Sequence, residues 1–552
     1  MAAAAPSTGS AWLYGPVSDL LFGAGLVYVP VFAALALAGG AIQAWLPVTL
    51  MPLLMVTING PHVGATLLRV YERAEDRQRY RFFAVHATLA IAALFVAGLY
   101  VPLLGSILIT LYLSVVPWHF TGQNYGIALI FLRRRGVPFT REQKGLLYFS
   151  FVSTYAMTLI ALHGEGVRTL APVDPTGTVY HLLRIGIPNP LMLSLLVVLG
   201  AAYLTALLRL AIGLARIAPV RDLLPAAAVV ASQALWFAVP LCAQLLAPAS
   251  ARLGPLDPTS YTYTALWVAL AHAVQYLWIT TYYARHQRGA TRPLPFLCKA
   301  TLAGATLHGV PLLIFLPGVL GTVPYDAGLY AMIGGALNLH HVLLDGAIWK
   351  LRSGPIARIL IQGADEAGLR PARTSRSLRW VGLAALGSGA LGVALTVLST
   401  VEFDVGFVRA AKRGDLPRLE QAARRLTWLG RDNPELRSEI ARLRLAHGDL
   451  DGSLSALEQS AALLPTASTW VRQGLVQERR GDRAAALAAY ERALELAPDF
   501  VPALHHAGVV ALESGQRERA RAWLERAAAL APDQAEIGAD LQRARRAGDR
   551  ES

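Results

Sequence analysis

Residues 106–132 read SILITLYLSVVPWHFTGQNYGIALIFL and are followed directly by Arg133, Arg134 and Arg135. His119 is the only basic side chain in this stretch, and no acidic side chain interrupts it. A helix needs about 20 apolar residues to cross the hydrocarbon core of a bilayer. The stretch therefore predicts a transmembrane helix, and the arginines that follow it indicate a cytoplasmic end.

Comparable apolar stretches recur along the chain up to residue 400 and give about eleven candidate spans. They lie near 18–40, 44–68, 82–103, 106–132, 146–163, 191–215, 223–247, 262–284, 298–319, 326–349 and 379–400. The predicted fold is all-α, with a polytopic transmembrane helical bundle over residues 1–400. Residues 401–552 are charged and Ala-rich, and they predict a second, soluble domain.

The composition excludes a single soluble domain and argues against nucleic-acid binding. Of the 552 residues, 54% are hydrophobic and only 16% are charged, whereas soluble proteins carry about 25% charged residues. The net charge of +14 comes largely from arginines in short loops between apolar stretches, where the positive-inside rule places them. The two cysteines form no CxxC pattern, so neither a disulfide framework nor a thiolate zinc site is expected.

The loop arginines also predict the topology. Basic clusters follow every even-numbered span, as at Arg133–Arg135 after the fourth, so those spans end in the cytoplasm. The N-terminus is then cytoplasmic, and it lacks the basic region of a cleaved signal peptide. An odd number of spans places residues 401–552 in the periplasm, which predicts a multi-pass protein of a bacterial inner membrane.

The tail contains repeats with a period of about 34 residues. Segments 433–466, 467–500 and 501–534 each predict a helix, a turn, a second helix and a proline exit, and Gly414-Asp415 suggests a degenerate earlier copy. With Ala485-Ala486, Tyr490 and Ala493 in its pattern, the tail resembles the tetratricopeptide family. The resemblance implies an α-solenoid whose concave surface binds a protein or peptide, although a folded spacer is the alternative.

Histidines recur inside four predicted spans that all run towards the cytoplasm. The distance from each histidine to the basic loop that follows it estimates its depth in the bilayer. His62 lies seven residues before Arg69 and His119 fourteen before Arg133, and His272 and His340 lie between these limits. The four depths therefore differ by at most about 10 Å along a helix. One layer of the bilayer can therefore contain them all, and neutral imidazole suits iron, copper or zinc. We expect a metal site, although interhelical hydrogen bonding explains any one histidine equally well. The predicted ligands are His62, His119, His272 and His340.

Three further residues complete the predicted site. Asp345 lies one helical turn beyond His341 and five residues beyond His340, so it could accept a hydrogen bond from a ligand imidazole and orient it. Tyr276 or His341 could line an open coordination position. Tyr276, His341 and Asp345 are therefore the expected catalytic residues.

The order of these motifs resembles the bacterial membrane β-carotene dioxygenase family (Brp/Blh). The similar elements are Pro61-His62-Val63-Gly64, His119-Phe120-Thr121-Gly122, the stretch around His272, and His340 to Asp345. The resemblance implies an iron site and a lipophilic substrate cleaved with dioxygen. This chain departs from the family pattern at Thr66, Asn124 and Tyr276, which indicates a related scaffold with altered ligands and another substrate.

Two classes of function follow. The first is a membrane-embedded, metal-dependent oxygenase or related redox enzyme, with iron preferred over zinc or copper and a lipophilic substrate from the bilayer. The second is a non-enzymatic membrane scaffold, or an envelope-assembly or export component, that recruits partners through the repeats. Haem ligation near His340-His341 is a third reading, although the sequence has no dedicated haem motif.

Overall fold

The computed structural model describes residues 10–45, 50–72, 74–165, 180–246, 261–286, 292–314, 330–349, 354–363, 376–429, 432 and 434–548. The described residues form α- and π-helices and no β-strand, which confirms the all-α prediction. Contacts divide the chain into two units, and the main boundary lies between Thr400 and Val401. Each unit is described separately below.

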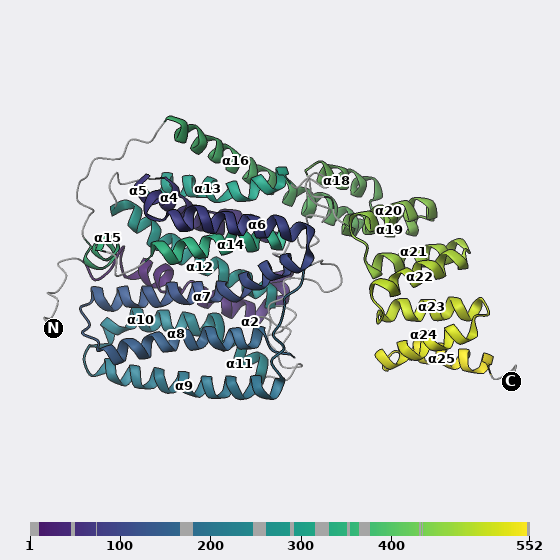
Figure 1. Cartoon of the computed structure of the whole chain (residues 1–552), viewed down its shortest axis with the longest axis horizontal. Helices are drawn as coiled ribbons and strands as arrows, with labels where there is room; N and C mark the ends of the chain where they lie inside the picture. The colour runs from purple at the N-terminus through teal and green to yellow at the C-terminus, as the bar shows by residue number, and fades with distance from the viewer. Residues whose placement is uncertain are drawn as a thin grey trace. The chain divides into compact units, whose positions relative to one another are not determined.

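The first unit is a bundle whose long helices lie alongside one another (Figure 1). Several of its helices begin or bend at π-helical segments, written η. Its longer elements are η1 (Asp19–Gly23), α2 (Tyr28–Trp45), η3 (Met55–Asn59), α4 (Gly60–Tyr71), η4 (Phe82–Ala87), α6 (Thr88–Tyr100), α7 (Pro102–Arg134), α8 (Arg141–Leu162), α9 (Asn189–Ala215), α10 (Val220–Gln233), η5 (Ala234–Ala238), α11 (Val239–Leu246), α12 (Tyr261–His286), α13 (Pro293–Ile314), α14 (Tyr330–Ile348), η10 (Arg358–Gln362) and α16 (Arg376–Val401).

Local sequence signals explain several helix ends. Helix α8 begins with a capping box in which the Thr140 side chain accepts a hydrogen bond from the Gln143 backbone N–H, while the Gln143 side chain accepts one from the Thr140 N–H. Helix α7 begins with Pro102, whose missing N–H costs nothing at a first helical position. Pro117 lies inside α7 and cannot donate the usual backbone hydrogen bond.

The expected eleven spans are not confirmed. Among the described residues, six helices are long and apolar enough to cross a membrane, or seven if the bent pair Pro16–Gly23 and Tyr28–Ala38 forms one span. Helix length alone is not the reason at the stretch near 44–68, because α3 (Met51–Leu54), η3 and α4 follow one another without a break. Asn59, Pro61 and His62 make this helix less apolar than those six.

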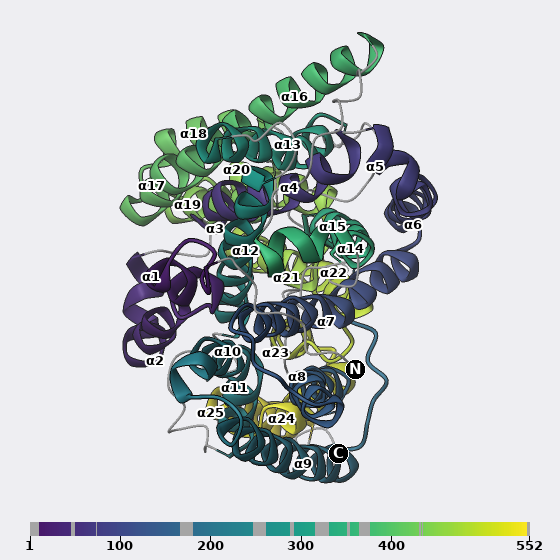
Figure 2. The same cartoon turned by 90° about the vertical axis from the view of Figure 1, so that its left-hand side faces the viewer.

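Two glycines set the contact between α4 and α13, which lie side by side in both cartoon views (Figures 1 and 2). A Cβ added to Gly64 would lie 1.8 Å from the Ala300 carbonyl oxygen, and one added to Gly304 would lie 1.8 Å from the Gly60 carbonyl oxygen. The two backbones therefore touch without intervening side chains. This contact fixes the helix that carries His62.

The second unit is a series of antiparallel helix pairs (Figure 1), as the repeats predicted. Gly414, Gly448, Gly481 and Gly515 have φ between 68° and 85°, the left-handed conformation that ends a helix. The tetratricopeptide-type α-solenoid is thus confirmed. Its elements are η11 (Glu402–Val408), α17 (Arg409–Arg413), α18 (Leu416–Trp428), α19 (Pro434–Ala446), α20 (Leu450–Leu463), α21 (Ala467–Arg480), α22 (Arg483–Leu496), α23 (Val501–Glu513), α24 (Arg517–Leu530) and α25 (Ala535–Gly548).

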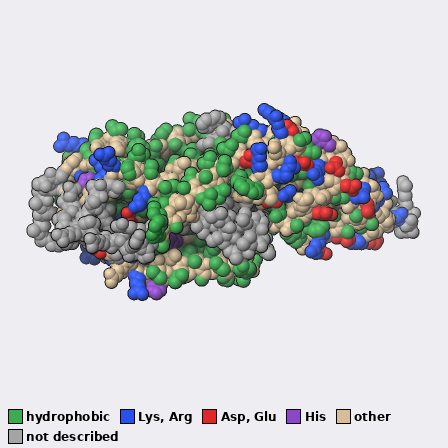
Figure 3. Space-filling view, turned by 90° about the horizontal axis from the view of Figure 1, so that it is seen from above, with side chains coloured by type: hydrophobic (Ala, Val, Ile, Leu, Met, Phe, Trp, Pro, Cys, Tyr) green, Lys and Arg blue, Asp and Glu red, His purple; other side chains and the backbone are tan. Residues whose placement is uncertain are grey.

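The surfaces of the two units differ in kind. In the view of Figure 3, hydrophobic side chains cover much of the described surface of the first unit, while acidic and basic side chains are mixed over the second. The core of the second unit combines small and large residues at repeat positions: Ala486 and Ala493 are fully buried, and so is the larger Tyr490. The described surface of the first unit is thus more apolar in this view than that of the second.

Candidate metal centre

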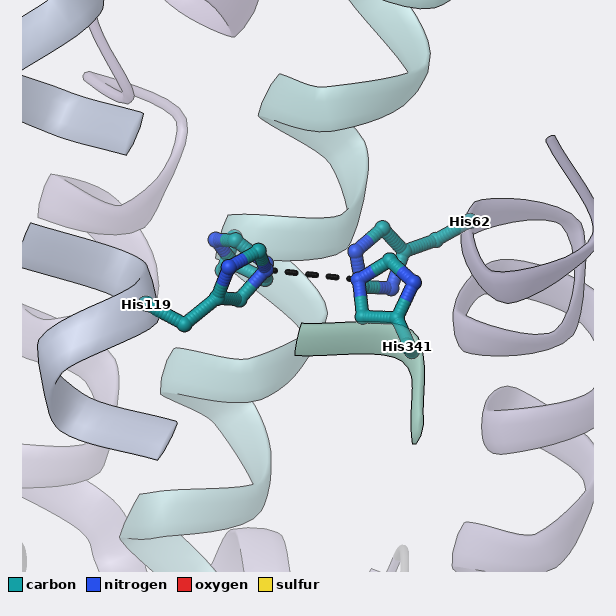
Figure 4. Close-up of side chains that lie close together, drawn as sticks. His62, His119 and His341 are labelled. Carbon is teal, nitrogen blue, oxygen red and sulfur yellow. Dashed lines mark hydrogen bonds between the residues drawn. The ribbon is translucent and has the colours of Figure 1, made fainter. Parts of the chain in front are cut away.

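Four histidines from four helices meet inside the first unit. His62 lies on α4, His119 on α7, His272 on α12 and His341 on α14, and each offers a nitrogen within 4.8 Å of the others. The imidazoles of His62, His119 and His341 point towards one another (Figure 4). All four rings are nearly inaccessible to solvent.

Ring-to-ring distances show how compact the group is. The His62 ring centroid lies 4.2 Å from that of His341 and 4.8 Å from that of His272. The His119 centroid lies 5.0 Å from His341 and 4.8 Å from His272. The four rings thus form the corners of a quadrilateral, with His62 and His119 6.3 Å apart across it.

A hydrogen bond fixes the tautomer of His62. Its Nδ1 lies 3.2 Å from the Asn59 Oδ1. Because a carbonyl oxygen can only accept, Nδ1 carries the proton and the lone pair lies on Nε2. That Nε2 is buried and has no hydrogen-bond partner among the described residues. Asn59 thus plays the part of the polar groups that orient metal-ligating imidazoles in other proteins.

His272 is held by packing alone. Its ring stacks on Phe120 with centroids 4.1 Å apart and planes inclined by 30°. Neither of its nitrogens has a hydrogen-bond partner in the described part of the chain, although the residue is 1% exposed. A buried N–H without a partner costs about 1–3 kcal/mol, so these two nitrogens are suited to bind a ligand.

His119 and His341 approach each other closely. Their Nε2 atoms lie 3.3 Å apart (dashed line in Figure 4). Two imidazole nitrogens bound at about 2.1 Å to one tetrahedral ion lie about 3.4 Å apart, so this pair has the spacing of two ligands. The widest separation in the group, 4.8 Å, exceeds that value and would have to shorten around an ion.

Asp345 lies against this pair and is anchored on its other side. Its Oδ2 lies 3.4 Å from His341 Nε2 and 3.8 Å from His119 Nε2. Its Oδ1 accepts hydrogen bonds from the Thr66 hydroxyl at 2.7 Å and the Tyr276 hydroxyl at 2.8 Å. Trp349 Nε1 in turn donates to the Tyr276 oxygen at 2.9 Å. The carboxylate is therefore held in one position beside the imidazoles.

The structure places His340 outside the group of four histidines. That residue was expected to be the ligand on α14, but its Nε2 lies 2.8 Å from the Thr88 hydroxyl and 3.4 Å from the Tyr71 hydroxyl. Neighbouring residues on a helix point about 100° apart, so His340 and His341 cannot share one centre. His341, which was expected only to line an open position, joins the group instead.

Asn59 and Trp349 were missed in the sequence, and Thr66 was noted only as a departure from the family pattern. Asn59, Thr66 and Trp349 contact the site through His62, Asp345 and Tyr276. The sequence did contain one indication that His341 belongs to the group. His341 lies four positions before Asp345, and residues at this spacing share one face of a helix. Asn59 and Trp349 carry no comparable signal, because only the packing of helices brings them to the site.

A cavity of about 530 Å³ opens beside the histidines. His119, Tyr276 and Asp345 line it together with a largely apolar wall that includes Trp118, Ile127, Ile130, Ile279, Val342 and Leu343. Cavities of about 300–1,000 Å³ with a few convergent polar groups are typical of small-molecule sites. An apolar molecule in this cavity would lie next to the His119 ring, which is the member of the histidine group that lines it.

Comparisons with known proteins address the tail. Residues 479–543 match the tetratricopeptide repeat family. Two crystal structures of MamA are similar to parts of this chain: one is 21% identical, with a TM-score of 0.20, and covers 26% of this chain and 84% of its own. The other is 18% identical, with a TM-score of 0.21, and the match covers 30% of this chain and 99% of the MamA chain.

No curated protein matches the chain. The family match lies within the tail, so the resemblance of the membrane helices to the β-carotene dioxygenases has no support from these comparisons. A repeat domain of this family indicates a protein partner for the tail.

Proposed function

We propose that the first unit is a membrane-embedded, metal-dependent oxygenase or related redox enzyme that acts on a lipophilic substrate, and that the repeat domain binds a protein partner. One observation carries the proposal: four buried imidazoles converge beside an apolar cavity, and several of their nitrogens have no partner among the described residues. A shared cation would engage all four rings at once.

The donor set limits the metal. Imidazole suits iron, copper and zinc, whereas magnesium and calcium prefer oxygen ligands. The Asp345 carboxylate, 3.4 Å from His341, would offset part of the charge of a divalent ion and position that ligand. A bound iron would supply the activation of dioxygen, and iron is preferred because the resembling family uses it.

The chain's own residues would position the substrate and a proton. The Tyr276 hydroxyl donates to Asp345 and accepts from Trp349, so it holds one proton at a fixed place on the cavity wall. The apolar residues that line the rest of the cavity would exclude water and favour a lipophilic molecule. The carotenoid of the resembling family is one candidate of this class.

The direct test is the metal content of the full chain, purified in detergent without chelators and measured by inductively coupled plasma mass spectrometry. We expect about one first-row transition ion per chain, since one four-histidine group holds one ion. The enzyme proposal would be excluded by two results together. The purified, monodisperse protein would contain less than about a tenth of an ion per chain, and it would still bind no metal after reconstitution with iron(II) or zinc. The non-enzymatic scaffold, whose repeats recruit partners, would then take its place.

We also propose a bacterial inner-membrane location with a cytoplasmic N-terminus and a periplasmic repeat domain, because arginines follow the even-numbered apolar stretches. Alkaline phosphatase fused after residue 400 is expected to be active, since it folds only outside the cytoplasm. The matched fusion after residue 378, at the opposite end of the predicted span 379–400, should be inactive. Equal activity of the two fusions would show that α16 does not cross the membrane.

A further inference from the structure

A second pocket lies at the start of the repeat domain, within the second unit. Its volume is about 250 Å³, and it lies between the helix formed by η11 and α17 and the following helix α18. Its lining contains four arginines and only two carboxylates. The charged residues are Arg409, Arg413, Arg418, Arg425, Glu402 and Asp415.

Helical spacing explains why these charges share one pocket. Glu402, Arg409 and Arg413 recur at intervals of seven and four residues, which places them on one face of a helix. Arg418 and Arg425 are seven residues apart on α18 and share a face in the same way. At the base of the pocket, a Cβ added to Gly406 would lie 3.2 Å from the Ala422 Cβ, so the two helices approach closely there.

The pocket has an excess of positive charge. Glu402 pairs with Arg425 at 3.3 Å, and Asp415 pairs with Arg418 at 3.4 Å. Arg409 and Arg413 have no hydrogen bond or ion pair with any residue that the structure describes. Guanidinium groups stay protonated in proteins, so this pocket carries two uncompensated positive charges one helical turn apart.

We propose that this pocket binds a phosphate group, with Arg409 and Arg413 as its main ligands and Arg418 and Arg425 on the opposite helix. Guanidinium forks match phosphate oxygens in pairs, and two unpaired arginines suit a phosphate better than a single carboxylate. The group can come from an anionic phospholipid or from a soluble phosphate compound. The lipid is expected, because the helix that begins in the apolar segment at Trp380 continues to Arg413.

The test compares binding by the full chain and by an R409Q/R413Q variant in detergent, with native mass spectrometry as the readout. Equal amounts of phosphatidylglycerol and phosphatidylcholine are offered, and inorganic phosphate is titrated separately. We expect the wild-type chain to retain at least about ten times more phosphatidylglycerol than the variant, because both unpaired guanidinium forks are lost. An R472Q/R479Q variant loses two exposed arginines of α21 and should bind like the wild type.

Each outcome identifies a source or overturns the site. Arginine-dependent retention of phosphatidylglycerol identifies a lipid headgroup, and arginine-dependent binding of inorganic phosphate alone identifies a soluble compound. An R409K/R413K variant keeps both charges without the guanidinium forks and should bind more weakly than the wild type but better than R409Q/R413Q. The proposal is overturned if R409Q/R413Q binds both probes like the wild type, or if R472Q/R479Q loses binding equally.

Discussion

Replacing His341 by Ala is expected to lower the metal affinity of the full chain at least about 100-fold, beyond the roughly 10–100-fold that residues outside the ligand set typically cost. His341 lies 3.3 Å from His119 and its ring is 4.2 Å from that of His62, so its loss opens one side of the site. The measurement is a metal titration of the variant and of the wild type, purified in parallel, which gives the affinity of each protein for the ion.

The neighbouring residue provides a matched control. His340→Ala removes the same side chain one position earlier on α14, where it contacts Thr88 and Tyr71 rather than the imidazole group. This variant should retain its metal. If His340→Ala loses the ion and His341→Ala keeps it, the arrangement of α14 in the site is wrong, and the original prediction of His340 as ligand is restored.

Replacing Gly64 by Ala is expected to destabilise the first unit by at least about 3 kcal/mol, the upper end of the usual cost of overpacking. The new Cβ would lie 1.8 Å from the Ala300 carbonyl oxygen, and backbone atoms cannot move aside as a side chain can. Helices α4 and α13 must therefore separate. The measurement is the temperature at which detergent-purified protein loses its monodisperse peak in size-exclusion chromatography.

Gly145→Ala is the control for this experiment, because a Cβ at Gly145 on α8 meets nothing within 4 Å. This variant should lose its monodisperse peak at the same temperature as the wild type. Unchanged melting of Gly64→Ala would show that the close contact between α4 and α13 is absent from the folded protein. The same variant should also weaken metal binding, because His62 lies on the helix that is displaced.

Helix type and repeat structure were predictable because they depend on local sequence. Each of the eleven apolar stretches contains helix, and the Gly-Asp turns at Gly448 and Gly481 lie where the tail changes direction. The number of spans was not predictable in the same way. Hydropathy identifies an apolar helix, but it does not show whether that helix crosses a bilayer or is buried among its neighbours.

The candidate site was predictable only in part. Depth along parallel helices selected His62, His119 and His272, which the structure brings together. Depth could not separate His340 from His341, since adjacent residues differ by only about 1.5 Å along a helix, and the direction of the side chain decided between them. Contacts such as Thr66 with Asp345 join residues far apart in sequence and depend on tertiary packing.

The turns of the repeat domain have a consequence for how such a tail can change in evolution. Gly414, Gly448, Gly481 and Gly515 share nearly the same backbone conformation, and Asp415, Asp449 and Asp482 each cap the helix that follows. A duplication or deletion that begins at one of these turns and ends at another would therefore join the chain through a turn of the same conformation. Whole helix pairs between Gly414 and Gly481 could thus be gained or lost while the turn and its cap are kept, so the length of the tail can vary while the first unit stays the same.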